Sequence, residues 1–132
     1  MGLPKSIDIE GVGLFEYCSG INYYKSTIML DGESFYINVE TKKESVINNL
    51  STPIKNVMDN FKMLNKKAIH HIKTYNSEDN SEKLEKRYLI FYENGSFQIG
   101  YDAGESPAGN LTIYVTFHKD FSAEKGLIFE VY

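Results

Sequence analysis

Three histidines are the first residues in this sequence that could do chemistry. His70 and His71 are adjacent in a segment with helical periodicity, so their side chains point roughly 100° apart and do not converge on one metal ion. His118 follows an alternating segment typical of a strand, and no His-x-x-x-His spacing occurs. The histidines therefore predict no metal site.

Cys18 is the only cysteine, so the chain has no intramolecular disulfide. It could act as a thiolate nucleophile if His70 or His118 came close to it in the fold. A lone cysteine at the end of a strand is more often a small apolar residue, which is the reading that we favour. A single cysteine also fits a reducing compartment.

Asp102, Glu105 and Glu93 are the carboxylates that could pair as acid and base or bind Ca²⁺. The segment 102–105 has too few oxygen ligands for a calcium loop, so we read it as a solvated turn. No Gly-x-Gly-x-x-Gly, P-loop or Gly-x-Ser-x-Gly motif occurs. We therefore expect no enzyme activity, no cofactor and no metal.

The composition describes an ordinary globular chain. It has 132 residues, of which 42% are hydrophobic, and this length fits one domain, residues 1–132. The 18 acidic and 14 basic residues give a net charge of -4, which argues against a nucleic-acid partner. No run approaches the roughly 18 apolar residues of a membrane span, so we expect a cytoplasmic protein.

Strand patterns lie at the two ends of the sequence. Residues 12–17, 24–30 and 35–39 read as a three-stranded meander, with Asp31-Gly32 as a hairpin signal. Near the other end, residues 88–93 and 97–102 flank Asn94-Gly95, the strongest short-range turn signal in the chain. Residues 111–118 and 127–131 then complete four further strands.

A helical block lies between the two groups of strands. A short turn near residues 45–51 precedes Ser51-Thr52-Pro53, a hydroxyl cap followed by proline, which predicts a helix start. Asn65 could begin a second helix, so one helix or two is left open. Apolar residues then recur every three or four positions, at Ile54, Val57, Met58, Phe61, Leu64, Ala68, Ile69 and Ile72.

The order of elements predicts an α+β fold. We expect an antiparallel sheet of about six to seven strands, three before the helical block and four after it, with one long or broken helix packed on one face. Residues 76–87 are polar and charged and read as a linker within the domain.

Alternation divides the strand residues into two faces. The predicted inner set faces the helix and consists of Phe35, Ile37, Val39, Phe97, Ile99, Leu111, Ile113, Val115, Phe117, Phe129 and Val131. The predicted outer set consists of Tyr36, Asn38, Gln98, Thr112, Tyr114, Thr116, His118, Glu130 and Tyr132. An outer face rich in tyrosine is suited to protein binding, because tyrosine gives a large contact area at a low entropic cost.

The sequence also resembles several related bacterial domain-of-unknown-function families of small α+β proteins. The resemblance spans most of the chain and is most specific in Asn65-Lys66-Lys67-Ala68 and in the strand Phe97-Gln98-Ile99-Gly100-Tyr101-Asp102. Some members of these families belong to toxin loci and are regarded as immunity proteins. The resemblance implies no catalytic residues.

Our leading hypothesis is a non-enzymatic protein-binding module, in one form an immunity-type protein that occludes a cognate, basic toxin domain. Its predicted contact residues are Tyr36, Gln98, Tyr114, Thr116 and Tyr132, with Asp102 and Glu105 at the rim. One alternative is a structural homo-oligomer that pairs through residues 127–132, if this strand lies at a sheet edge. The other alternative is a small-molecule-binding domain with a pocket between helix and sheet.

Overall fold

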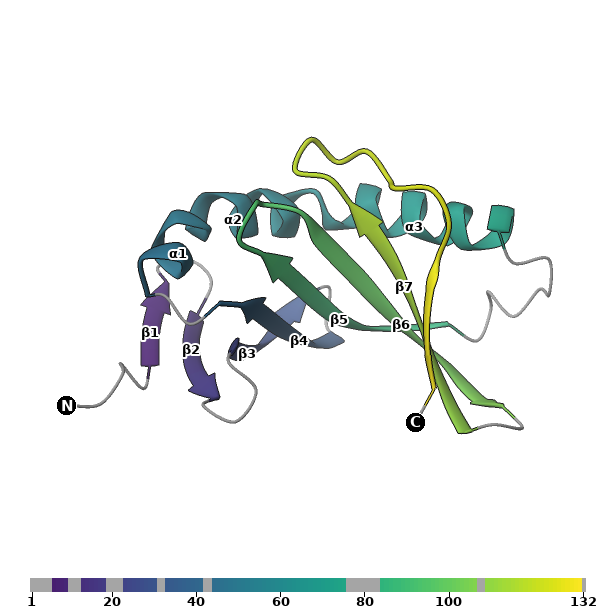
Figure 1. Cartoon of the computed structure of the whole chain (residues 1–132), viewed down its shortest axis with the longest axis horizontal. Helices are drawn as coiled ribbons and strands as arrows, with labels where there is room; N and C mark the ends of the chain where they lie inside the picture. Colours follow the sequence, from purple (N-terminus) through teal and green to yellow (C-terminus); the bar gives the residue numbers. More distant parts are fainter. Residues whose placement is uncertain are drawn as a thin grey trace.

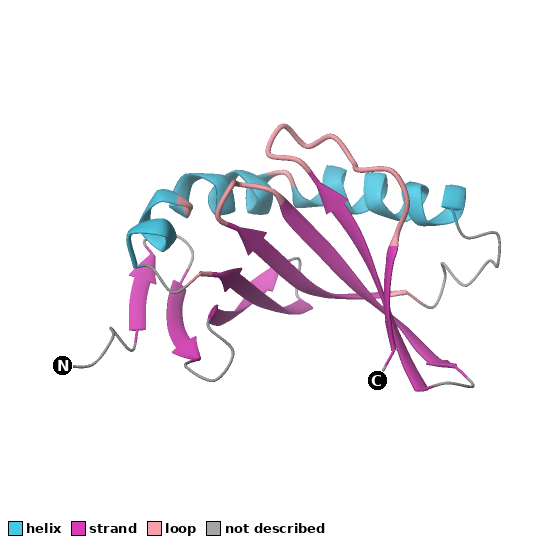
Figure 2. Cartoon of the chain, in the orientation of Figure 1, coloured by secondary structure: helices cyan, strands magenta, loops and turns pink. Residues whose placement is uncertain are grey.

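The computed structural model describes residues 6–9, 13–18, 23–30, 33–41, 44–75, 84–106 and 109–131, which form eight strands and three helices (Figures 1 and 2). In chain order the elements are β1 (Ser6–Ile9), β2 (Gly13–Cys18), β3 (Tyr23–Leu30), β4 (Glu33–Glu40), α1 (Glu44–Asn49), α2 (Ser51–Asp59), α3 (Phe61–Tyr75), β5 (Glu85–Tyr92), β6 (Phe97–Ser106), β7 (Gly109–Phe117) and β8 (Ile128–Val131).

All eight strands belong to one sheet, in which each strand pairs with the next along the chain. The α+β class is confirmed, but the expected strand count was too low because β1 was not recognised. β1 has four residues, and its alternation rests only on Ile7 and Ile9, which is too short a pattern to separate from a loop.

The sheet is mixed and not wholly antiparallel. β4 and β5 run parallel, while every other described pair is antiparallel. The physical reason is the helical block, which returns the chain to the end of the sheet where β4 began. A crossover of this kind makes the next neighbouring strand parallel.

The hairpin predicted at Asn94-Gly95 is confirmed. Gly95 has a φ of 89° and donates its N–H to the Tyr92 carbonyl, while Ser96 accepts from the Tyr92 N–H. A left-handed residue at this point favours glycine, so the sequence determines the turn locally. β3 and β4 also form the predicted antiparallel pair, although Asp31-Gly32 lies outside the described residues.

The helix start predicted at Ser51-Thr52-Pro53 is confirmed, but the helix cap and the position of the second break differ from the prediction. α2 begins at Ser51 with Leu50 as its N-cap residue, and the Ser51 hydroxyl donates to the Asn48 carbonyl rather than capping the helix. The second break falls at Asn60, which ends α2 with a φ of -106°. Asn65 instead lies inside α3, where its side chain accepts a hydrogen bond of 2.6 Å from the Tyr101 hydroxyl. That contact explains why asparagine is accepted within this helix.

The core lies between the helices and one face of the sheet (Figure 1). The predicted apolar stripe is confirmed as the buried side of α2 and α3, with Met58 and Ile69 partly buried at its margins. Phe61 meets Phe35 of β4 edge to face, with ring centroids 4.9 Å apart. Aromatic pairs in this geometry are favourable beyond their burial, so the contact anchors the junction of α2 and α3 on the sheet.

The predicted linker 76–87 was too long. Glu85–Tyr92 is a strand, and Glu85 and Lys86 pair with Asp102 and Tyr101 of β6 before a bulge ahead of Tyr88. The charged run Glu85-Lys86-Arg87 hid this strand, because only the last part of β5 alternates clearly. Residues 76–83 lie outside the described part of the chain.

Candidate functional site

The described side chains among the predicted reactive residues do not converge on one site. His71 Nε2 lies 2.9 Å from the Gly126 carbonyl, while the side chains of His70 and His118 are exposed. Cys18 ends β2, and its side chain is not among those described. Across the described residues, no group of three His, Cys, Asp or Glu side chains is placed to hold a metal ion.

Glu93 and Asp102, the two of the three carboxylates whose side chains are described, lie far apart along the sheet. Glu93 accepts a hydrogen bond from the Thr41 hydroxyl at the β5–β6 turn. Asp102 lies five residues after Phe97, the first residue of β6, and is therefore roughly 17 Å along the strand from that end at the usual strand rise. Asp102 instead accepts a hydrogen bond of 2.9 Å from the Gly104 N–H. Glu105 pairs with Asn110 through the backbone, and its side chain is not described.

The side of the sheet away from the helices, which we call the outer face, contains most of the predicted contact residues. The strand register places Tyr36, Gln98, Tyr114, Thr116 and Asp102 on it. Tyr132 lies outside the described residues. The alternation therefore assigned the side of the sheet correctly, but it did not show which of these side chains are accessible.

Three members of the predicted outer set are buried. Gln98 and Tyr114 are each 8% exposed, and Thr112 is 1% exposed. The Tyr114 ring lies over Gly100, its neighbour on β6, so closely that a Cβ at Gly100 would be 2.7 Å from Tyr114 Cε1. Pairing an aromatic ring with a glycine on the next strand buries both and stabilises the sheet.

The buried side chain of Gln98 lies in the middle of a chain of side-chain hydrogen bonds. The Tyr92 hydroxyl donates to Gln98 Oε1 at 2.9 Å, and Gln98 Nε2 donates to the Thr116 hydroxyl at 3.1 Å. Burial raises the pKa of Tyr92, and the nearby negative charge of Glu40 raises it further, so this hydroxyl stays a donor at neutral pH. Gln98 and Tyr114 thus hold β5, β6 and β7 together rather than presenting a contact surface.

One accessible part of the outer face is a hollow of about 520 Å³ over β2 to β5. Tyr36 lines it and is 48% exposed, and its ring stacks on that of Tyr88 with centroids 5.8 Å apart. Leu14 and Tyr23 also line it, and Leu14 is 52% exposed. Sequence reasoning missed these two residues, although extending the alternation of β3 back by one residue places Tyr23 on the same face as Tyr36.

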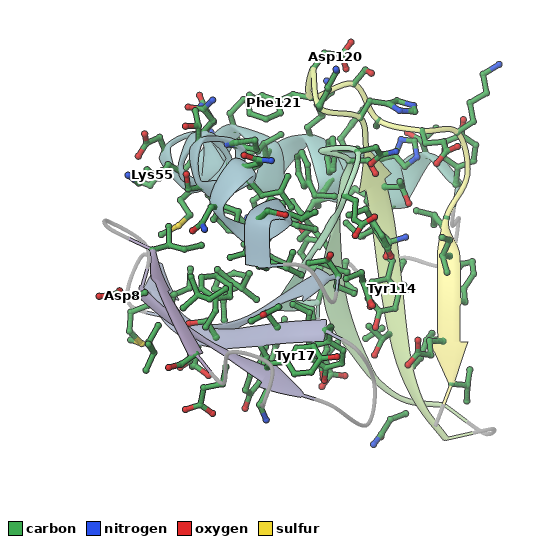
Figure 3. All side chains as sticks on the ribbon, turned by 60° about the vertical axis from the view of Figure 1, so that its left-hand side comes forward. Asp8, Tyr17, Lys55, Tyr114, Asp120 and Phe121 are labelled. Atoms are coloured by element: carbon green, nitrogen blue, oxygen red, sulfur yellow. The ribbon has the colours of Figure 1, made fainter. Side chains whose placement is uncertain are left out.

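Charge is divided between the two sides of the molecule. The exposed side of the helices has five lysines against one described acid, Asp59. These lysines are Lys55, Lys62, Lys66, Lys67 and Lys73. Figure 3 shows Lys55 on the helical side and Asp8 on β1.

The described side chains of the outer face reverse this balance, with six carboxylates against one lysine, Lys25. Burial raises the pKa of one of the six, Glu40, above its ordinary value. The carboxylates are Asp8, Glu16, Glu40, Glu85, Asp102 and Glu130.

β8 departs from the prediction for its inner residues. Phe129 and Val131 were expected to pack against the helix, but they are 52% and 46% exposed. The segment after β7 contacts α3 instead, through Lys67 Nζ to the Phe121 carbonyl at 2.7 Å and His71 to Gly126. Because this segment occupies the helix surface, α3 does not cover β8.

No protein-family model, curated protein or solved structure matches this chain. Within the described residues, no helix is both long and apolar enough to cross a membrane.

Proposed function

We propose that this protein is a non-enzymatic binding module whose outer face recognises a basic protein partner. The observation that carries the proposal is the charge division, since six carboxylates and one lysine are the charged groups among the described side chains on the side of the sheet that the helices leave uncovered. Complementary charge of this kind speeds association and selects among partners.

The hollow over β2 to β5 supplies the apolar part of such a surface. Tyr36 and Leu14 are about half exposed there, and tyrosine is enriched in protein interfaces because its ring is large and has few rotatable bonds. Glu16 and Lys25, which lie opposite each other in the register of β2 and β3, also line the hollow. The contact residues that we propose therefore lie in the hollow around Tyr36, and the buried Tyr114 is no longer one of them.

The particular form that we propose is an immunity-type protein whose partner is a basic toxin domain. The resemblance inferred from the sequence motivates this form of the proposal, and the acidic outer face supports it. Binding over the toxin's active site would neutralise the toxin without any catalytic group on this chain. The sign of the charge favours a nuclease-like partner with a positively charged cleft.

A tagged capture from the native host, with bound proteins identified by mass spectrometry, tests the proposal. Tyr36→Ala should reduce the yield of a stoichiometric basic partner at least tenfold. Tyr75→Ala is the matched control, because Tyr75 is 49% exposed on α3 and Tyr36 is 48% exposed on the outer face.

Two results would contradict the proposed function. The first is an equal loss of partner in both variants, which would not place the contact on the outer face. The second is the absence of any stoichiometric partner. Thermal melts of both variants establish that they are folded, as their partial exposure predicts.

A further inference from the structure

The backbone edge of β8 that points away from β7 has no neighbour among the described strands. β8 pairs with β7 on one side and is the last strand in the sheet order. Backbone N–H and C=O groups along such an edge form a template for one more strand.

The side chains of β8 are exposed on both faces of the sheet. Ile128 on the outer face is 50% exposed, and Phe129 and Val131 on the inner face are 52% and 46% exposed. Edge strands are usually protected by a very short length, a bulge, a proline or inward-pointing charge, and of these β8 has the short length, with four residues. β8 shows an unbroken register with β7, contains no proline, and has Glu130 as its one charged residue.

β1, at the opposite edge of the sheet, gives the contrast within the same molecule. Its inner residues Ile7 and Ile9 are 7% and 4% exposed, and Asp8 points outward between them. The chain therefore completes the core at one edge and leaves apolar side chains uncovered at the other. This asymmetry marks β8 as the edge that another strand would complete.

The charges beside β8 indicate which kind of strand fits there. The register places Glu85, Asp102, Thr112 and Glu130 in one row across β5 to β8 on the outer face. A residue added opposite Glu130 would extend this row beside the Glu130 carboxylate. A basic side chain is favoured there and an acidic one is disfavoured.

A second copy of this chain fits that position less well. Antiparallel pairing of two β8 strands that keeps the inner faces together places Phe129 opposite its counterpart and Ile128 opposite the other copy's Glu130. The apolar pairs match, but each copy adds its own row of carboxylates to the same outer face. A basic partner brings the opposite charge.

We propose that β8 is a docking edge for an extended segment of the protein partner in which basic and apolar residues alternate. Basic side chains of this segment lie on the outer face beside Glu130, and apolar ones cover Phe129 and Val131 on the inner face. Backbone hydrogen bonds to β8 supply affinity, and the alternation supplies specificity. This inference rests on the proposed function, because the segment belongs to the same basic partner.

The test uses the full chain and a nine-residue peptide in which lysine and valine alternate. Amide hydrogen exchange followed by NMR should show at least tenfold slower exchange within residues 128–131 when the peptide is saturating. A peptide with glutamate in place of lysine, and one with the same lysines and valines in two blocks, should leave this exchange unchanged. Equal protection by the blocked peptide would overturn strand addition.

A pair of charge reversals at the two edges locates the contact. Glu130→Lys should weaken binding of the alternating peptide at least tenfold, whereas Asp8→Lys should change it less than twofold. Both carboxylates are exposed on the outer face of an edge strand, so the variants differ only in the edge that they alter. Equal effects of the two variants would overturn the inference.

Sedimentation of the peptide-free protein distinguishes a partner segment from a second copy of the chain as the occupant of the β8 edge. We expect the mass of a single chain at all concentrations. A dimer that Phe129→Lys dissociates would assign the β8 edge to a second copy and overturn the partner segment.

Capture from the host then separates this inference from the function on which it rests. A partner that is lost with Tyr36→Ala but fully retained with Glu130→Lys would support the proposed function and refute docking at β8. The absence of any partner would refute the proposed function itself.

Discussion

Gly100 and Tyr114 show how a single missing side chain shapes the outer face. The Tyr114 ring occupies the space that a Cβ on Gly100 would need, and the Cβ of Tyr88 lies 3.1 Å from that position on the other side. The backbone of Gly100 is not left-handed, so the requirement for glycine here is one of space and not of conformation.

We predict that Gly100→Ala destabilises the fold by about 1–3 kcal/mol, the usual cost of an overpacked site. In a Tyr114→Ala background the same change should cost clearly less, because the clashing ring is absent. Urea denaturation of the four proteins in this cycle measures the coupling free energy. Strict additivity would contradict the ring-over-glycine contact.

Tyr101 joins the sheet to α3 at the same scale. It is 1% exposed, its hydroxyl donates to Asn65 Oδ1 at 2.6 Å, and burial raises its pKa well above the ordinary value. Tyr101→Phe should lower the free energy of unfolding by about 1–2 kcal/mol, because the Asn65 amide loses its partner. In Asn65→Ala protein the same change should cost less. An equal cost in both backgrounds, measured in urea, would show that the hydrogen bond contributes nothing.

The turn after β7 is an element held by local hydrogen bonds. Asp120 Oδ1 accepts from the Ser122 N–H at 3.0 Å and from the Ser122 hydroxyl at 2.6 Å. These bonds, the side-chain one first, lower the pKa of Asp120 below its ordinary value. A lowered pKa of an acid means that its stabilising effect is present above the unfolded-state pKa, about 3.9, and is lost as pH falls through the lower folded-state value.

Ser122→Ala should therefore be less stable than the parent at pH 7, and the difference should shrink as pH falls below about 4. Asp120 is fully exposed, so the effect is small and is best followed by chemical denaturation at a series of pH values. Asn94 makes the same pair of bonds to Ser96 at the other turn and carries no charge. Ser96→Ala should show no such acid dependence, and a matching dependence in both variants would contradict the role of Asp120.

The elements that local chemistry determines were predictable from the sequence. Asn94-Gly95 forms its hairpin because the turn requires a left-handed glycine, and the apolar stripe of the helices is buried as its spacing predicts. What could not be predicted depends on contacts between distant residues. Asn65 lies inside α3, where the Tyr101 hydroxyl of β6 donates to its side chain, and the break falls at Asn60, a second asparagine of the same helix-capping type.

The sequence predicts on which face of the sheet the candidate residues lie, but it does not predict which of their side chains are exposed. Period-two alternation assigns Tyr36, Tyr114 and Gln98 to one face, yet it carries no information on which neighbours cover them. Tyr114 is buried because Gly100 happens to lie opposite it, which only the strand register reveals. The exposure of Phe129 has the same kind of cause. The segment after β7 contacts the surface of α3, so β8 does not pack there.

At the scale of the whole molecule, the net charge of -4 conceals two surfaces of opposite sign. Among the described side chains, five lysines lie on the exposed side of the helices and six carboxylates lie on the outer face of the sheet. Figure 3 shows one of each, Lys55 and Asp8. This division orients an approaching charged partner more strongly than the net charge alone, and salt weakens the effect. A basic partner is therefore expected to meet the sheet and not the helices.

The most direct measurement of this claim is the captured partner's affinity for two charge-matched variants. Glu16→Lys changes the outer face at the margin of the hollow, and Asp59→Lys makes the same change on the exposed side of α2. We predict that Glu16→Lys weakens binding at least tenfold while Asp59→Lys changes it less than twofold. An equal loss in both variants, or a loss with Asp59→Lys alone, would contradict recognition through the outer face.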